Sequence, residues 1–258
     1  GFAVLKNHPI PQKFVEDVYQ DWETFFKDDA KFEYCFDPAS TRQSGYFPFK
    51  SENAKGYSTK DLKEFYHYRD LNDLPKGMAP NTQVLLEELS TLASQVLNWV
   101  EAGLPKDIAE TLSMPLGQML HNSDMSLVRI LHYPPVTDAE EEGAVRAAAH
   151  EDIDLLTILP AATAPGLQVQ DKAGNWHDVP CDYGTLIFNA GDMLQLATKG
   201  YYKSTTHRVV NPVGDLARQS RYSVPLFLHP RSEIQLSHAH TAGSYLLERL
   251  REIGTSSV

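Results

Sequence analysis

Three residues that lie apart in the chain have side chains that could hold a divalent metal ion. His150 and Asp152 are two positions apart in a stretch expected to form a strand, so their side chains should project from the same face. A second imidazole, His207, follows far enough along the chain for several strands to intervene. Two imidazoles and one carboxylate on one side of a cation leave its opposite coordination positions open. Such a set suits a non-haem Fe(II) centre that admits a co-substrate and O₂, and it could also hold Zn²⁺ for hydrolysis.

The elements that must position these residues divide into a helical first part and a β-rich second part. Apolar residues recur at helical spacing from Pro11 to Asp29 and from about Thr82 to Val100, and they also predict a closing helix at Ser244–Ile253. The β-prone runs are Ser126–Tyr133, Ala148–Leu159, Gly166–Gln170, Thr185–Asn189, His207–Val210 and Arg221–Leu228. Short strands separated by turn residues are typical of an antiparallel sandwich or barrel. We therefore expect one α+β domain with a mainly β core and a helical N-terminal layer.

Composition excludes several classes of protein. Hydrophobic residues make up 42% and charged residues 22% of the 258 positions, which is ordinary for a globular chain. A net charge of −11 without a dense basic stretch disfavours nucleic acid and anionic membranes as partners, and no apolar run approaches the ~20 residues that span a bilayer. The two cysteines, Cys35 and Cys181, favour a reducing compartment, so we expect a cytoplasmic location. Nothing in the composition suggests an oligomer, so we expect a monomer. The chain opens at Gly1 rather than Met, which leaves open whether a targeting segment precedes it.

Several motifs occur together in the order of one enzyme family. They are His150-Glu151-Asp152, Asn189–Gln195, Tyr202–Val209, the strand-like Arg129–Pro135, and Arg221-Tyr222-Ser223 followed by Phe227 and Pro230. This series closely resembles the isopenicillin N synthase-like branch of the 2-oxoglutarate/Fe(II)-dependent dioxygenases, the iron/ascorbate oxidoreductase family. The resemblance covers nearly the whole chain, from Gly1-Phe2 to the last helix.

The resemblance implies a double-stranded β-helix, or jelly roll, with a C-terminal helix. The boundaries would be 1–120 for the mainly helical N-terminal layer, 121–235 for the jelly-roll core and 236–258 for the C-terminal helix, all within a single domain over 1–258.

The resemblance also implies a set of site residues. Fe(II) would be held by His150, Asp152 and His207, and 2-oxoglutarate would chelate the metal. The far carboxylate of 2-oxoglutarate would meet Arg221 and Ser223, with Tyr133 nearby, and Phe227 could line the substrate pocket. A planar guanidinium suits a carboxylate better than an ammonium group does, which agrees with an arginine at this position.

The function implied is an oxygenase that uses Fe(II), 2-oxoglutarate and O₂, with ascorbate as an optional reductant. It would couple decarboxylation of 2-oxoglutarate to succinate with hydroxylation of a small organic substrate, or with its desaturation or cyclisation. The sequence does not identify that substrate.

Two departures from the family pattern keep alternatives open. Leu131 stands where this branch usually has Asn, which leaves room for an Fe(II) oxidase of the isopenicillin N synthase or ascorbate type that does not use 2-oxoglutarate. Arg221 lies somewhat further from His207 than expected, and Arg218-Gln219-Ser220 offers the same pattern three residues earlier. We prefer Arg221 because only that register places Phe227 and Pro230 correctly. A non-catalytic small-molecule receptor on the same fold and a zinc hydrolase are less favoured.

Overall fold

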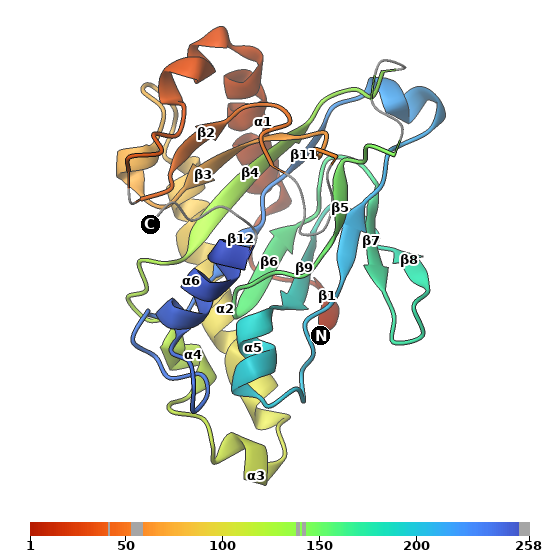
Figure 1. Cartoon of the computed structure of the whole chain (residues 1–258). Coiled ribbons are helices and arrows are strands. Elements are labelled where there is room, and N and C mark those ends of the chain that lie inside the picture. The colour runs from red at the N-terminus through yellow and green to blue at the C-terminus, as the bar shows by residue number, and fades with distance from the viewer. Residues whose placement is uncertain (41, 53–58, 138–139, 141–142, 253–258) are drawn as a thin grey trace.

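Two antiparallel β-sheets form the centre of the molecule, as the computed structural model of residues 1–40, 42–52, 59–137, 140 and 143–252 shows (Figure 1). The larger sheet contains, in spatial order, β1 (Phe2–Lys6), β9 (Thr185–Ala190), β6 (Leu156–Pro160), β12 (Leu226–Leu228), β4 (Leu127–Tyr133), β3 (Glu64–Tyr68) and β2 (Gly45–Phe47), with β11 (Arg221–Ser223) paired to β4. The smaller sheet contains β5 (Ala147–His150), β10 (His207–Val209), β7 (Leu167–Gln170) and β8 (Trp176–Asp178). This arrangement is the expected double-stranded β-helix.

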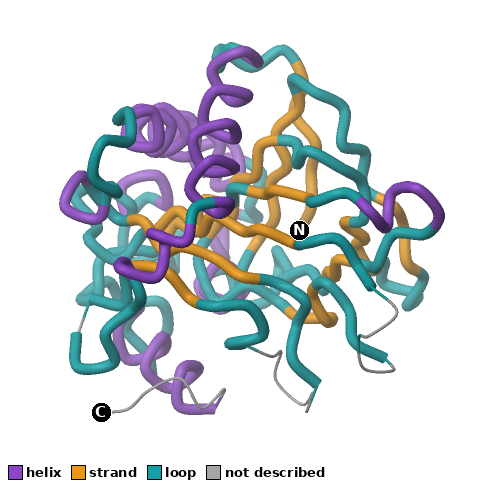
Figure 2. Tube along the Cα trace, turned by 90° about the horizontal axis from the view of Figure 1, so that it is seen from above, coloured by secondary structure: helices purple, strands orange, loops and turns teal. Residues whose placement is uncertain are grey.

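The helices pack mainly against the outer face of the larger sheet, and Figure 2 shows the same arrangement from above. The α-helices are α1 (Gln12–Lys27), α2 (Asn81–Ala102), α3 (Lys106–Ala109), α4 (Leu116–Met119), α5 (Asp192–Ala197) and α6 (Ala242–Glu252), and the 3₁₀ helices are η1 (Asp29–Tyr34), η2 (Leu71–Asp73) and η3 (Gly214–Arg218). The indole of Trp22 on α1 is fully buried and donates a 2.8 Å hydrogen bond to the Thr82 hydroxyl on α2. This bond holds the two long helices together inside the apolar layer. Within the described residues, no helix is both long and apolar enough to cross a bilayer.

Strand β4 lies between two apolar clusters and contributes side chains to both. Val128 and Ile130 belong to the apolar cluster beneath the helices, whereas Leu131 and Tyr133 belong to a second cluster between the two sheets. Successive side chains of a strand point to opposite faces, so the alternation of this run gives each face its own set. The inner face of β4 therefore supplies a wall of the space between the sheets.

The predictions of three helices are confirmed by α1, α2 and α6. The last residue of the predicted closing helix, Ile253, lies outside the described residues. Other expectations were wrong. The predicted strand Ala148–Leu159 is two strands, β5 and β6, because the chain crosses from the smaller sheet to the larger one between them. The run Arg221–Leu228 is also two strands, β11 and β12, since Pro225 at the break has no N–H for the ladder. Strands β1, β2, β3 and β8 were not predicted.

Helix α5 begins at Asp192, directly after Gly191, at a point where the sequence is typical of a turn. Gly191 lies so close to Asp154 that an added Cβ atom would sit 2.1 Å from the Asp154 carbonyl oxygen. Glycine at this position thus reflects close packing of the helix start against the segment before β6.

A buried polar cluster joins the helical layer to the larger sheet. The Glu64 carboxylate on β3 contacts the imidazole Nδ1 of His132 at 2.6 Å, the Lys31 ammonium at 3.0 Å and the Tyr46 hydroxyl. Burial would raise the pKa of Glu64, but the hydrogen bonds from His132, Tyr46 and Lys31 hold it below its ordinary value. Glu64 is therefore ionised and contributes to stability at neutral pH.

We expect Glu64→Ala to lower the free energy of unfolding by about 3–5 kcal/mol, because three partners lose their carboxylate in a buried site. The difference in the free energy of unfolding between Glu64→Ala and the unaltered protein should shrink as pH falls. A carboxylate with a depressed folded-state pKa stabilises the fold above its unfolded pKa, near 4.3, and that stabilisation is lost as pH falls through the folded value. Urea unfolding at several pH values measures both effects. Glu88→Ala, at an exposed position on α2, is the control; equal losses in the two variants would contradict the assignment.

Candidate metal centre

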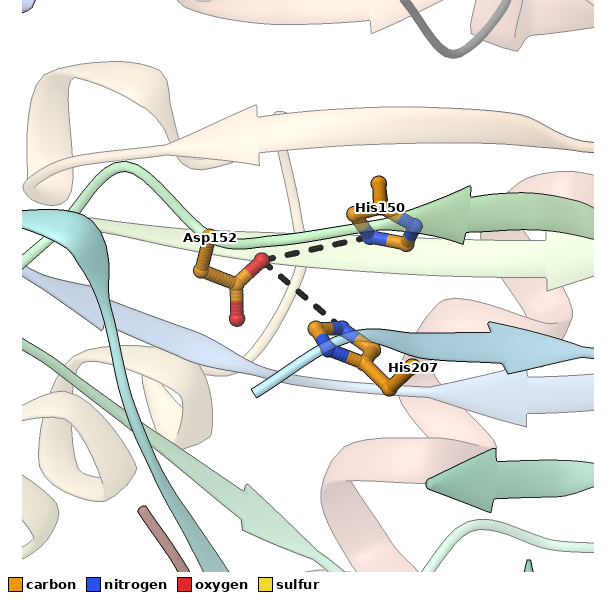
Figure 3. Close-up of side chains that lie close together, drawn as sticks. All are labelled: His150, Asp152 and His207. Carbon is orange, nitrogen blue, oxygen red and sulfur yellow. Dashed lines mark ion pairs between the residues drawn. The ribbon is translucent and has the colours of Figure 1, made fainter. Parts of the chain in front are cut away.

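Three side chains from the smaller sheet and the segment after it converge on one point (Figure 3). His150 ends β5 and His207 begins β10, and the two residues are direct partners in the antiparallel register with ring centroids 4.4 Å apart. Asp152 Oδ1 lies 3.9 Å from His150 Nε2 and 3.8 Å from His207 Nε2. These separations are too long for hydrogen bonds. The three ligand atoms face a common space without bonding one another, as a cation site requires.

Asp152 reaches this point in a way that the sequence did not predict. It does not share a strand with His150, because β5 ends at His150 and Asp152 lies in the irregular segment that leads to the larger sheet. Its orientation comes from two hydrogen bonds to Oδ2, one from the Thr157 hydroxyl at 2.7 Å and one from the Asn189 amide at 2.8 Å. With Oδ2 engaged, Oδ1 is directed to the two imidazoles.

Both imidazoles are held in the tautomer that a metal needs. His150 Nδ1–H donates to the Ala148 carbonyl at 2.8 Å, and His207 Nδ1–H donates to the Thr205 carbonyl at 3.0 Å. A carbonyl can only accept, so Nδ1 carries the hydrogen in each ring and Nε2 presents its lone pair to the centre.

The charges at the centre also suit a divalent cation. Desolvation and the neighbouring His207 lower the pKa of His150 to about 4, so this ring is neutral at pH 7. Burial would raise the pKa of Asp152, but His207, His150 and the hydrogen bonds from Thr157 and Asn189 keep it below the ordinary value. A carboxylate beside a neutral imidazole is the protonation state in which both groups bind metal.

The centre opens onto a cavity between the two sheets. Its empty volume, with the open mouth included, is about 610 Å³. The lining residues are Phe2, Lys63, Arg129, Leu131, Tyr133, Ala147, His150, Asp152, Thr157, Leu159, Leu167, Asn189, His207, Val209, Arg221, Ser223, Pro225 and Phe227. All seven residues predicted for the site therefore lie on one cavity.

The sheet register brings Arg221, Ser223 and Tyr133 together at one end of the cavity. In the pairing of β11 with β4, Arg221 lies opposite Tyr133 and Ser223 lies opposite Leu131. Arg221 and Ser223 share the inner face of β11. Tyr222 points to the other face, where its ring stacks on the imidazole of His132. Arg218 is exposed in η3 and does not line the cavity. Of the two Arg-x-Ser registers, the one at Arg221 reaches the site.

Arg221 is a buried cation that has no acidic partner among the described residues. Its exposed fraction is 2%, its Nε donates to the Ala164 carbonyl at 2.9 Å, and its Nη1 is buried without an acceptor. A buried donor without a partner is costly unless a ligand supplies the acceptor. The far carboxylate of 2-oxoglutarate, or another organic anion, fits this requirement.

Sequence reasoning gave no role to several residues that shape the site. Thr157 and Asn189 orient Asp152, and Arg146 places a second buried guanidinium 5.9 Å from the Tyr133 ring. Burial and the nearby Arg221 lower the pKa of Arg146 to about 10. Asn189 could have been identified from the sequence, because it begins the Asn189–Gln195 motif. Nothing in the sequence around Arg146 distinguished it from a surface residue.

We expect Asn189→Ala to weaken binding of a divalent metal by ~10–100-fold, because Asp152 loses one of the two bonds that fix its Oδ2. Titration of the protein with Co²⁺, followed by visible absorbance, measures the change. The matched control is Asn81→Ala, which removes an amide that bonds Asp21 at the start of α2. Unchanged Co²⁺ affinity in Asn189→Ala would show that Thr157 alone positions the carboxylate.

Comparisons with known proteins agree with this arrangement. The model of the 2OG-Fe(II) oxygenase superfamily matches residues 124–230, and the model described as non-haem dioxygenase in morphine synthesis N-terminal matches residues 1–85. The first match contains the three candidate metal ligands, and the second covers much of the helical layer with β1 to β3.

Solved structures resemble the chain over almost its full length. A protein from Shewanella oneidensis described as an oxygenase is 49% identical with a TM-score of 0.88, covering 99% of this chain and 91% of that one. A 2OG-Fe(II) oxygenase family protein from Caulobacter crescentus is 30% identical with a TM-score of 0.76, covering 98% and 90%. A full-length protein from Neurospora crassa, solved in complex with alpha-KG, is 26% identical with a TM-score of 0.76, covering 97% and 86%.

Proposed function

Because the chain belongs to the 2OG-Fe(II) oxygenase superfamily, we propose that its cavity oxidises a small organic substrate with 2-oxoglutarate as co-substrate. The observation that carries the proposal is the unpaired, buried Arg221 on the same cavity as the triad of His150, Asp152 and His207. A metal site alone would also suit a hydrolase. The additional buried cation is explained by an anionic co-substrate, which hydrolysis does not require.

Each group of residues has a distinct task in this proposal. His150, Asp152 and His207 hold Fe(II) from one side, while Arg221 and Ser223 receive the far carboxylate of 2-oxoglutarate beside Tyr133. Bound iron with 2-oxoglutarate and O₂ supplies the oxidising power for hydroxylation, desaturation or cyclisation, with succinate and CO₂ as the co-products. Leu131, Leu159, Leu167 and Val209 give the cavity an apolar wall that keeps water from the reacting groups.

The alternative without 2-oxoglutarate depends on Leu131, which lies opposite Ser223 and lines the cavity with a side chain that cannot hydrogen-bond. The co-substrate-dependent function is favoured because Arg221 would otherwise stay unpaired. The free thiols of Cys35 and Cys181 support a reducing, cytoplasmic location. A monomeric state and the lack of a nucleic-acid partner stay predictions from the sequence.

Two measurements test the proposed function. Anaerobic protein with Fe(II) and 2-oxoglutarate should develop a weak visible charge-transfer band, and aerobic samples should release succinate from 2-oxoglutarate. O₂ consumption measured with and without 2-oxoglutarate separates this function from that of an oxidase that does not need it. Protein that binds Fe(II) but shows neither the band nor succinate would contradict the proposal.

A further inference from the structure

The charges that line the cavity are opposite in sign to the net charge of the chain. The protein carries a net charge of −11, yet the charged side chains lining the cavity, among the described residues, are the cations Lys63, Arg129 and Arg221 and the single carboxylate of Asp152. Asp152 belongs to the metal triad, and Arg221 is assigned to 2-oxoglutarate. Lys63 and Arg129 are the two cations that the proposed co-substrate does not use.

Lys63 and Arg129 form the cavity side of a buried ionic cluster. The Lys63 ammonium lies 2.8 Å from Glu52 Oε2 and 2.8 Å from Asp61 Oδ2, and Arg129 Nη1 lies 3.1 Å from the same Glu52 oxygen. Neither Glu52 nor Asp61 lines the cavity. The acids hold the cations from behind, so a molecule in the cavity meets the positive side of the cluster first.

The ionic cluster is charged at neutral pH. Burial would lower the pKa of Lys63, but Glu52 and Asp61 raise it above its ordinary value. Burial would likewise raise the pKa of Glu52, but Arg129 and Lys63 hold it below its ordinary range. The cationic wall therefore persists over the pH range in which the enzyme would work.

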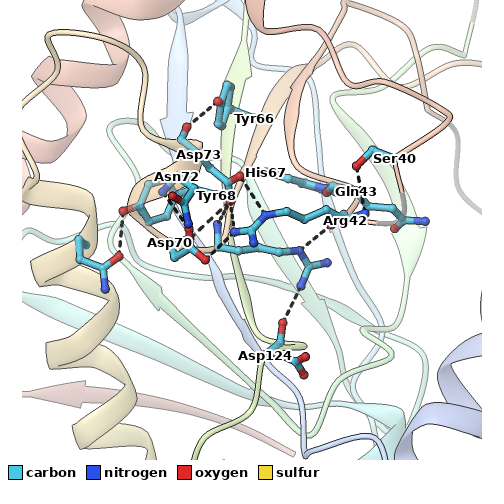
Figure 4. Close-up of polar contacts among 12 residues, drawn as sticks. Ser40, Arg42, Gln43, Tyr66, His67, Tyr68, Asp70, Asn72, Asp73 and Asp124 are labelled. Atoms are coloured by element: carbon cyan, nitrogen blue, oxygen red, sulfur yellow. Dashed lines mark hydrogen bonds and ion pairs between the residues drawn. The ribbon is translucent and has the colours of Figure 1, made fainter.

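Arg129 is held rigidly and keeps one terminal nitrogen free. Its Nε donates to His67 Nε2 at 2.8 Å, and His67 Nδ1–H donates to the Gln43 carbonyl at 3.0 Å. Figure 4 shows His67 and Gln43 within a polar network that includes the ion pair of Arg42 with Asp73. Within the described chain, Arg129 Nη2 has no acceptor. A fixed guanidinium with an unused donor is prepared for an acceptor on a ligand.

Arg129 and Arg221 enter the cavity from different positions along β4. Arg221 lies opposite Tyr133, whereas the Arg129 amide bonds the Pro225 carbonyl, so the backbones of the two arginines are about four strand positions apart, roughly 13 Å. The cavity therefore has two separate cationic ends. If 2-oxoglutarate occupies the end at Arg221, the end at Arg129 faces the substrate.

The surroundings of Arg129 are aromatic and apolar. Its guanidinium carbon lies 4.6 Å from the centroid of the Phe65 ring and 5.5 Å from that of Phe227. Phe227 and Pro225 line the cavity beside it. Apolar walls lower the local dielectric constant and strengthen attraction to an anion, and they also offer contact to an apolar ligand body.

We infer that the substrate is a small organic carboxylate, whose carboxylate group binds Arg129 and Lys63 while its apolar or aromatic body packs against Phe227. The inference rests on the proposed function, because it takes Arg221 as the partner of 2-oxoglutarate. It also assigns a specificity role to Lys63, just before β3, and to Arg129 of β4, two residues that lie outside the metal and co-substrate positions.

Ligand binding to the full chain loaded with Zn²⁺ and 2-oxoglutarate tests this inference without turnover. The probes are three pairs of acids and neutral amides: 3-phenylpropionate and 3-phenylpropionamide, cyclohexanecarboxylate and cyclohexanecarboxamide, and hexanoate and hexanamide. Saturation-transfer NMR titrations should show the acids binding at least ~10-fold more tightly than their amides, about 1.4 kcal/mol. Because 2-oxoglutarate occupies Arg221 in these samples, that residue cannot produce the preference.

Variants identify the residue responsible. Arg129→Gln should abolish the preference for acids and leave amide binding within ~2-fold, and Arg129→Lys should retain part of the preference. Arg251→Gln, at an exposed position on α6, changes the net charge equally and should retain all of it. If Arg129→Gln fails to fold, the acid and amide comparison on the unaltered protein still decides.

Two results would overturn the inference. One is equal binding of acids and amides, and the other is no binding of any acid at millimolar concentration, since two cations that line the cavity should hold small acids at that level. Binding of 2-oxoglutarate, measured in the same samples before the probes are added, tests the proposed function separately. Protein that takes 2-oxoglutarate but shows no preference for acids keeps the proposed function and loses this inference.

Discussion

His207→Ala should reduce succinate release from 2-oxoglutarate by about 10³-fold or more and weaken Co²⁺ binding to a similar degree. The imidazole supplies one of three ligand atoms that lie within 4.8 Å of one another. The remaining pair, His150 and Asp152, cannot hold the metal in the same geometry, and metal-dependent stabilisation of several kcal/mol is lost with it. Succinate assays and Co²⁺ titrations monitored by absorbance measure the two effects.

The matched control for this variant is His121→Ala, which removes an exposed imidazole far from the triad in sequence. It should leave Co²⁺ affinity and succinate release unchanged. The fold of His207→Ala should persist, because the His207 backbone keeps its pairing with β5 and β7. A folded His207→Ala variant with normal metal affinity would exclude the triad as the metal centre, whatever its activity.

The part of the site that depends on strand alternation was predictable from sequence. Arg221 and Ser223 share one face of β11, as two positions apart in a strand implies, and Tyr133 faces them because β4 pairs with β11. To predict that the two imidazoles lie together, one must also know that β5 pairs with β10, which places His150 opposite His207. Family resemblance supplied it, since spacing within a single sequence does not determine which strands are neighbours.

The part that depends on irregular segments was not predictable. Asp152 owes its position to hydrogen bonds from Thr157 and Asn189 after the strand has ended. The argument from alternation selected a residue that does lie beside both imidazoles, but strand alternation is not what places it there. The region that holds Lys63 contains Gly and Pro residues typical of loops, and its charged residues resemble a solvated surface. In the folded chain, β3 pairs with β4 and places Lys63 at the cavity beside Arg129.

The net charge of the chain does not determine which substrate the cavity binds. A charge of −11 describes the whole surface, which is mostly remote from the site and screened by salt. Binding depends instead on the few charges that line the cavity, where water is scarce. Among the described residues, three of the four charged side chains that line the cavity are cationic. An acidic protein can therefore select an organic anion, and long-range repulsion would reduce the rate of its encounter more than its affinity.

Arg221→Met should raise the dissociation constant of 2-oxoglutarate by ~30-fold to several-thousand-fold, because the far carboxylate would stay unpaired in a buried site. Anaerobic titration of the charge-transfer band measures it. The dissociation constant of Arg221→Lys should lie between those of the unaltered protein and Arg221→Met, since lysine keeps the charge but not the planar guanidinium. The neighbouring variant Arg218→Met is the control, because Arg218 is exposed and should not alter binding. Stronger dependence on Arg218 than on Arg221 would reverse the assigned register.

Thermal unfolding of Arg221→Met separates a binding role from a structural one. Without 2-oxoglutarate, Arg221 is a buried cation with no acidic partner among the described residues and with an unsatisfied Nη1, so replacing it by Met should leave the melting temperature unchanged or raise it. With saturating 2-oxoglutarate, the unaltered protein should gain stability through ligand linkage, and the variant should gain much less at the same concentration. A structural arginine would behave in the opposite way: the variant would be less stable without ligand, and the gain on adding 2-oxoglutarate would be preserved.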